Sequence, residues 1–230
     1  MGTISIEHGD RMFWLGRYTE RVFTTLKSLE RVYDMTLDGN ADCYKQYLSA
    51  FGLSDCGDAD TFFRSYIFDK KNPGSVAHSL ERAYDNGIVL REEISTEALS
   101  FLQMAMDKLE KSSESTQGLL LALLPMEDIL FGFWGCISDY IYDREILTII
   151  RCGKSVERLD LYLRLKYPWR MINLEFERLC RNLQNVPKNS PYRYNTKHLS
   201  VLAELMGMGE DYTERADEAI ISVGRLFETV

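Results

Sequence analysis

Prolines, histidines and clustered basic residues are scarce in this sequence. Its 230 residues include five prolines and three histidines, and 35 acidic residues outnumber 27 basic ones to give a net charge of −8. Binding to phosphate-rich partners needs clustered Lys and Arg, so this charge argues against a general affinity for nucleic acid or for an anionic membrane. A net negative charge is still compatible with a local basic site on the protein.

Motifs of several common chemistries are also missing. The sequence has no P-loop, no dinucleotide-binding glycine fingerprint, no Gly-x-Ser-x-Gly elbow and no set of kinase motifs. A di-iron bundle would carry two Glu-x-x-His pairs, whereas His78 and Glu81 stand in the reverse order. The five cysteines form no Cys-x-x-Cys pair, which favours reduced thiols over disulfides or a zinc site. We therefore expect no metal and no cofactor, and the motifs assign no catalytic residue.

No segment has the pattern of a membrane span. The most apolar stretch, residues 118–137, contains Pro125 and the adjacent acids Glu127 and Asp128 near its centre. A span rarely carries two acids there, so we predict a buried helix that bends or breaks near Pro125. The first residues lack the basic and apolar regions of a secretory signal, and we expect a cytoplasmic protein.

Apolar residues recur with helical spacing along almost the whole chain, and strand patterns are nearly absent. Asn72 is predicted to cap a helix that has Pro73 in its first position. Long helices with short connections favour an all-α fold, a single-domain bundle over residues 1–230. The predicted helices cover about 6–34, 42–53, 61–69, 70–94, 95–111, 118–142, 143–166, 169–184, 196–207 and 210–230, with a linker-like stretch at 111–118 and a loop at 185–196.

One short pattern occurs twice in the chain. "WLGRYTERV" at 14–22 and "RCGKSVERL" at 151–159 align without gaps when Gly16 is placed on Gly153. Each copy has a basic residue after the glycine and a Glu-Arg pair four and five positions after it. A glycine inside a helix costs about 1 kcal/mol relative to alanine, which a close helix crossing can offset. The candidate functional cluster is therefore Arg17, Glu20, Arg21, Lys154, Glu157 and Arg158.

We hypothesise that the two helices cross near their glycines, with Glu20 facing Arg158 and Glu157 facing Arg21. Such a cluster has three possible roles: a buried structural network, a site for a carboxylate or phosphate ligand, or a solvated surface. Arginine binds both kinds of anion bidentately, which suits a ligand site. If the cluster is a solvated surface, its charges would form salt bridges within one helix, worth a few tenths of a kcal/mol each.

Three segments follow one another along the chain: "DRMFWLGRYTERV", "NPGSVAHSLERAYDNGIVLREEI" and "GKSVERLDLYL". In this order they resemble the alpha-E family of all-helical bacterial proteins with Glu-Arg motifs, and the resemblance runs from about residue 4 to 227. The third segment departs from the family pattern, because Lys154 and Ser155 replace an arginine and an aromatic residue. The family's motif residues fall on Trp14, Gly16, Arg17, Tyr18, Glu20, Arg21, Asn72, Pro73, Ser75, Gly153, Glu157 and Arg158. Trp14, Tyr18, Asn72 and Ser75 are thus secondary site candidates.

The resemblance also implies a functional context. Family members occur beside, or fused to, circularly permuted ATP-grasp proteins and transglutaminase-like proteins, which suggests the synthesis or modification of peptides. The expected function is that of a non-catalytic accessory protein that binds the ATP-grasp enzyme or its peptide or carboxylate substrate. One alternative is an enzyme of the same pathway that uses Glu20 and Glu157 as acid and base and Arg21 and Arg158 to hold an anion. The other is a helical scaffold or dimerisation module, since a homodimer is also possible.

Overall fold

A computed structural model describes residues 4–40, 42–54, 56–113, 123–187, 190 and 192–227. All the regular secondary structure in these ranges is helical, which confirms the all-α fold. The Cα positions group into two compact units, one formed by residues 18–142 and the other by residues 1–17 with 143–230. Each unit is described by itself below, and the single domain expected over residues 1–230 stays a prediction.

The first helix contributes to both units. Helix α1 covers Ile6–Leu37, and the unit boundary falls within it, between Arg17 and Tyr18. It ends three residues beyond the expected Asp34, and the chain then turns through Gly39, whose φ of 96° lies in the left-handed region. Leu15, Val22 and Leu29 are fully buried, so the apolar spacing along α1 marks a core face.

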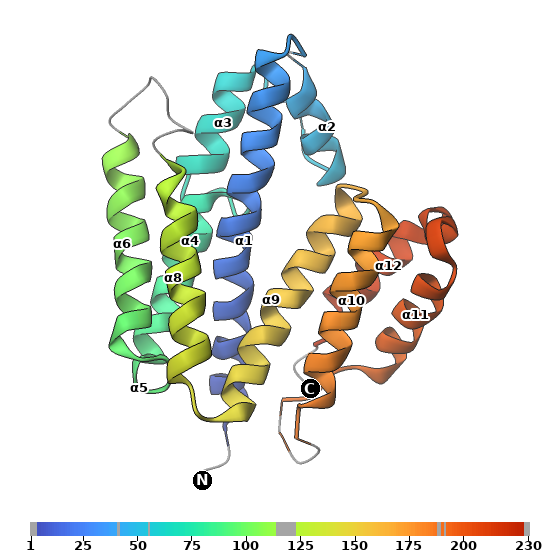
Figure 1. Cartoon of the computed structure of the whole chain (residues 1–230). Helices are drawn as coiled ribbons and strands as arrows, with labels where there is room; N and C mark the ends of the chain where they lie inside the picture. The colour runs from blue at the N-terminus through green and yellow to red at the C-terminus, as the bar shows by residue number, and fades with distance from the viewer. Residues whose placement is uncertain are drawn as a thin grey trace. The chain divides into compact units, whose positions relative to one another are not determined.

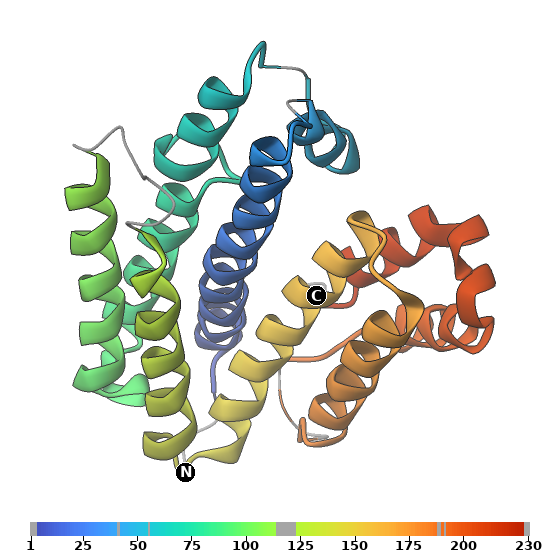
Figure 2. The same ribbon diagram turned by 45° about the horizontal axis from the view of Figure 1, so that its top comes forward.

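The unit of residues 18–142 holds the greater part of α1 and six further helices among its described residues. Helices α6 and α8 lie side by side and α4 packs against α6, as both views show (Figures 1 and 2). The six are α2 (Cys43–Ala50), α3 (Ala59–Phe68), α4 (Val76–Val89), α5 (Arg91–Ile94), α6 (Thr96–Ser113) and α8 (Pro125–Tyr140). Pro125 occupies the start of α8, where its missing N–H is harmless, so the predicted break at this proline is confirmed.

The other unit joins the N-terminal part of α1 to residues 143–230. Helix α9 packs along α10 and also contacts α12, which in turn contacts α11 (Figure 1). The helices are α9 (Arg144–Arg164), α10 (Trp169–Gln184), α11 (Thr196–Gly207) and α12 (Ala216–Gly224), with a 3₁₀ segment η1 at Gly209–Arg215. Two polar caps start helices here, since Asp143 accepts from the Glu145 amide and Asn195 from the Lys197 amide.

The predicted cap at Asn72 is wrong. Helix α4 begins at Val76, and its cap is Ser75, whose hydroxyl accepts a hydrogen bond from the His78 amide at 3.0 Å. Asn72 instead closes a turn, because its side-chain oxygen accepts from the Gly74 amide at 3.0 Å. Pro73 therefore lies in this turn and not in the first position of the helix.

Two predicted helices are also interrupted. The helix expected over 70–94 divides at Leu90 into α4 and α5, and the one expected over 210–230 begins as the 3₁₀ segment η1. A hydrophobic pattern cannot tell a 3₁₀ turn from an α-helical one over so few residues. Most of the linker-like stretch, residues 114–118, lies outside the described residues, as do three positions of the loop at 185–196.

Within the described ranges, no helix combines the length and the apolar character needed to cross a membrane. All five cysteines are free thiols.

Candidate functional site

The N-terminal part of α1 crosses α9 at the two motif glycines. A methyl group added at Gly16 would overlap the carbonyl oxygen of Ile150 and lie 3.1 Å from the amide nitrogen of Lys154. A methyl group added at Gly153 would overlap the carbonyl oxygen of Phe13 and lie 3.1 Å from the amide nitrogen of Arg17. Both positions belong to the same compact unit. The predicted crossing near the glycines is confirmed.

The contacts at this crossing are reciprocal. Each glycine faces the carbonyl three residues before the other glycine and the amide one residue after it. The two backbones therefore approach each other around a local pseudo-twofold axis, with the glycine Cα–H groups directed at carbonyl oxygens, a weak but recurrent contact between helices. Any side chain would hold the helices apart, and this explains why the repeated motif contains a glycine at the centre of an apolar helix.

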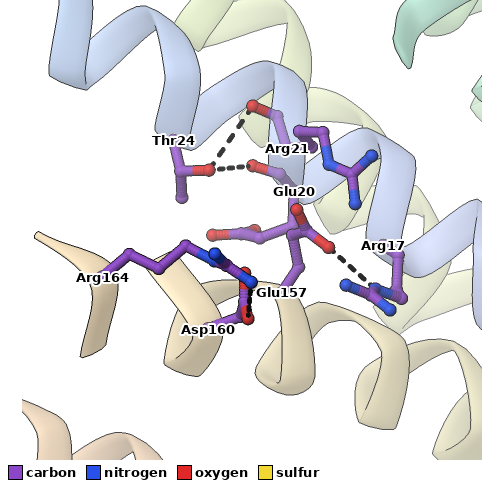
Figure 3. Close-up of polar contacts among 7 residues, drawn as sticks. All are labelled: Arg17, Glu20, Arg21, Thr24, Glu157, Asp160 and Arg164. Atoms are coloured by element: carbon purple, nitrogen blue, oxygen red, sulfur yellow. Dashed lines mark hydrogen bonds and ion pairs between the residues drawn. The ribbon is translucent and has the colours of Figure 1, made fainter. Parts of the chain in front are cut away.

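An ion pair joins the two motifs beside the crossing. The Arg17 Nε atom donates to the Glu157 Oε2 atom at 2.7 Å, and the two side chains are only 12% and 7% exposed (Figure 3). The Arg17 guanidinium also lies over the ring of Trp14, at 4.8 Å from the centroid. The expected partner of Glu157 was Arg21, so the pairing of Glu157 with Arg17 is a finding of the structure. The carboxylate and the ring together hold the Arg17 guanidinium in place.

Glu157 and Arg158 point to different neighbours, because adjacent residues on a helix differ by about 100° in direction. Arg158 faces α10, where its Nη1 atom lies 3.8 Å from the carboxylate of Glu175. Arg178 donates to the same carboxylate at 3.0 Å. Glu175 was not among the sequence candidates, although an acid inside the apolar stripe of α10 is the pattern of a buried, paired carboxylate. The second motif thus binds two helices, α1 through Glu157 and α10 through Arg158.

The Glu-Arg pair of the first motif belongs to the other compact unit. Glu20 is fully buried, and its backbone carbonyl accepts a hydrogen bond from the Thr24 hydroxyl at 2.9 Å (Figure 3). The Arg21 guanidinium lies over the ring of Tyr18 at 5.6 Å. The hypothesised pairings of Glu20 with Arg158 and of Glu157 with Arg21 would join the two units, and they stay predictions.

Aromatic residues surround the start of α1 on the side of Gly9. The ring of Tyr192 stacks on Phe227 at 5.4 Å and lies 5.7 Å from the ring of Phe13. A methyl group at Gly9 would approach the Tyr192 ring to 2.9 Å, so this glycine also permits close packing. The Tyr192 side chain is buried in this cluster. Burial raises the pKa of its hydroxyl, and the carboxylate of Asp10 adds to the effect.

Asp10 sits one turn before Trp14 and is linked to it by a hydrogen bond from the indole. Burial raises the pKa of Asp10, while the bond from Trp14 and the charge of Arg11 oppose that rise. Trp14 therefore has a polar partner on one side and the Arg17 guanidinium over its ring. Of the secondary candidates, Trp14 lies at the crossing, whereas Tyr18, Asn72 and Ser75 belong to the other unit.

Other reactive groups serve packing or capping. Cys152, next to Gly153, is fully buried, and burial raises the pKa of its thiol. His78 contacts the Lys70 carbonyl through its Nδ1 atom at 2.8 Å, and the Nδ1 atom of His198 lies 3.3 Å from the Ser222 hydroxyl. Over the described ranges, no three side chains of His, Cys, Asp or Glu gather in a way that could hold a metal ion.

The fold and this crossing define an all-helical protein built around a repeated glycine and Glu-Arg motif. The chain belongs to the Alpha-E family, described as a predicted alpha-helical domain with a conserved ER motif, whose model matches residues 8–167. The match contains both copies of the motif and ends before α10, so it is shorter than the resemblance over 4–227. No curated protein and no solved structure matched the chain.

Proposed function

We propose that this protein is an accessory partner of an ATP-grasp amide-bond-forming system and binds the enzyme or its peptide or carboxylate substrate. The chain belongs to the Alpha-E family. The proposal is supported by what the resemblance to this family implies, a circularly permuted ATP-grasp neighbour. The observation that carries it is the ion pair of Arg17 with Glu157, which joins two helices where they cross.

A motif used in this way holds the fold together. Removing one partner of a buried ion pair leaves an uncompensated charge, so Arg17 and Glu157 each have a structural reason to be present. The Arg17 guanidinium, which could otherwise bind an anion, is held by Glu157 and by the ring of Trp14. A protein whose signature motif is structural performs its function through other surfaces, which favours binding to a partner over catalysis by this pair.

The test is direct binding between the full chain and a circularly permuted ATP-grasp protein of the kind that the resemblance implies as its neighbour. Titration calorimetry should give a dissociation constant in the micromolar range or below. No heat of binding at concentrations on the order of 100 μM would contradict the proposal. Adding a nucleotide and the peptide substrate in separate titrations distinguishes binding to the enzyme from binding to its substrate.

Glu157→Gln separates the accessory role from the enzymatic alternative. If the pair is structural, this variant should unfold at lower temperature but bind the ATP-grasp protein with unchanged affinity while it is folded. If Glu157 acts as an acid or base, the variant should retain binding and abolish turnover of the coupled system. Loss of turnover in a fully folded variant would therefore contradict the proposed structural role.

A further inference from the structure

Helix α10 has one buried face and one exposed face. The buried face belongs to the compact unit that α10 shares with α9. It consists of four apolar residues and the carboxylate of Glu175: Ile172, Glu175, Phe176, Leu179 and Leu183. The exposed face contains Arg170, Met171, Leu174, Glu177, Arg178 and Arg181. At about 100° per residue, these six positions fall within an arc of about 120°, and we call them the α10 outer face.

Two aliphatic side chains lie at the middle and one edge of the α10 outer face. Met171 is 41% exposed and Leu174 is 46% exposed. Single exposed apolar residues are common on protein surfaces. Here, however, both lie among three arginines on one helix face, which is the composition of a protein contact, where Met and Arg are enriched.

The positive charge of the α10 outer face is only partly neutralised within the chain. Arg178 contacts the buried carboxylate of Glu175 at 3.0 Å, and the same carboxylate lies 3.8 Å from Arg158. Arg181 lies 4.0 Å from Glu177, the limit of an ion pair, and its side chain is 60% exposed. No described residue forms an ion pair with Arg170, which is exposed. A local excess of positive charge therefore stands on a chain whose net charge is −8.

We infer that the α10 outer face binds an acidic, amphipathic helix of a partner protein. The inference rests on the proposed function, because it names the surface that the partner covers. Arginine forms planar, bidentate contacts with carboxylates, and Arg170 and Arg181 lie on either side of Leu174 along the helix. They are about 16 Å apart along the axis, a length that about three turns of a partner helix would match. The partner's apolar residues would cover Leu174 and Met171.

Charge and composition favour this occupant over two others. A second copy of this chain would bring its own arginines to the same face across a symmetric contact, and like charges would oppose one another. An anionic membrane would need a broader apolar face, since interfacial helices bury large hydrophobic side chains, and would be repelled by the net charge of −8. A partner helix with glutamates around a leucine stripe meets both features of the α10 outer face.

The probe is a fluorescently labelled synthetic helix of about 15 residues, with a leucine stripe flanked by glutamates. Its anisotropy is measured against the full chain. We expect saturable binding that weakens as salt is added. Three results would each overturn the inference: no binding of the probe, equal binding of a peptide with lysine in place of glutamate, or binding of anionic vesicles without binding of the probe. Self-association of the chain that excludes the probe would also overturn it.

The decisive variant is R170E combined with R181E, which reverses two exposed charges and leaves the Arg178–Glu175 pair intact. Binding of the probe should weaken at least tenfold. The matched control is R64E combined with R82E in the other unit, where two exposed arginines pair with acids of their own helices, as Arg181 does with Glu177. The control should bind like the wild type. Equal loss in both variants would indicate general charge attraction and would contradict a specific site.

Binding of the ATP-grasp protein to the wild type and to R170E/R181E is the measurement that separates this inference from the proposed function. If the ATP-grasp protein binds the wild-type chain and R170E/R181E equally well, the function stands and the α10 site is wrong. If the ATP-grasp protein does not bind but the acidic helix binds in an α10-dependent way, the proposed function is wrong and the site stands. Loss of both interactions in R170E/R181E, with thermal unfolding unchanged, supports both.

Discussion

In one compact unit the motif glycines face backbone, whereas in the other Gly132 faces a side chain. A methyl group at Gly16 or Gly153 would overlap a carbonyl oxygen, and one at Gly132 would overlap the ring of Phe101. A backbone carbonyl inside a helix cannot move without moving the helix, but an aromatic ring can rotate. Glycine therefore marks two kinds of close contact in this protein. The contact with a backbone carbonyl is rigid, whereas the contact with an aromatic ring can adjust.

The two units also differ in how many carboxylates contact one basic side chain. The Arg17 guanidinium contacts the carboxylate of Glu157 at 2.7 Å. In the unit of residues 18–142, the Lys27 ammonium contacts two carboxylates, Glu127 at 2.6 Å and Glu30 at 3.2 Å. Burial raises the pKa of Glu30, as does its hydrogen bond with Glu127, while Lys27 opposes the rise. Two acids beside one base make a contact that depends on pH.

The largest expected effect is that of Gly153→Ala. Because the added methyl group would overlap the Phe13 carbonyl, α1 and α9 must separate, and we expect a loss of about 3 kcal/mol, the upper end for overpacking. Urea unfolding followed by circular dichroism measures it. Gly135→Ala is the control, because a methyl group there meets nothing within 4 Å and should stabilise α8 by up to about 1 kcal/mol. Equal stabilities of the two variants would contradict the rigid crossing.

Glu157→Ala should have the second largest effect. It leaves the Arg17 guanidinium without its carboxylate, and we expect a loss of about 2 kcal/mol. This is less than for a completely sealed pair, since the Arg17 side chain is 12% exposed and keeps its contact with the ring of Trp14. Thermal unfolding of the variant measures the loss. Glu177→Ala, which removes an exposed acid on α10, should change stability by a few tenths of a kcal/mol at most. If both variants lose the same stability, the pair at the crossing has no special role.

Gly132→Ala sharpens the contrast between backbone and side-chain contacts. The ring of Phe101 can move away from the new methyl group, so the expected loss is about 1 kcal/mol. In a double-mutant cycle, Phe101→Leu should recover part of that loss by removing the ring from the position of the methyl group. Additive effects of the two substitutions would show that the ring is not what the methyl group meets.

Glu30→Gln is expected to have the smallest effect, and one that depends on pH. The raised pKa of Glu30 means that its contribution to stability is present below its ordinary value of 4.5 and is lost as pH rises through the folded-state pKa. The neutral amide should therefore stabilise the protein more at pH 8 than at pH 4, by less than about 1 kcal/mol. Unfolding midpoints at both pH values measure this difference. Glu81→Gln, at the exposed pair with Lys70, is the control. A difference that is the same at pH 4 and pH 8 would contradict the assignment.

Much of the local structure could be predicted from the sequence. Helical spacing placed α1, α9 and α10 within a few residues of their ends, and Pro125 marked the start of α8. The cap at Asn72 was wrong because Asn72 and Ser75 are both good capping residues, and the choice depends on which of them leaves the turn at Gly74 closed. The 3₁₀ segment η1 could not be distinguished from a short α-helix by its pattern.

The candidate site was predictable only in part. The matching patterns around the two glycines predicted that the helices cross there. The candidate cluster drawn from these patterns contained both residues of the ion pair, Arg17 and Glu157. The role of Glu175 was missed, because its partners lie on α9 as well as on α10. An acid in an apolar stripe indicates a buried pair, but it does not say which arginine supplies the other charge.

The sequence by itself determined the helices, the repeated motif and the presence of glycine where two helices must meet, because these follow from residue spacing along one chain. Only the tertiary structure decided that Arg17, which follows the first glycine by one residue, meets Glu157, which follows the second by four. These residues are 140 positions apart. Which of them touch depends on the angle and offset at which two backbones cross, and this is set by the packing of both helices together.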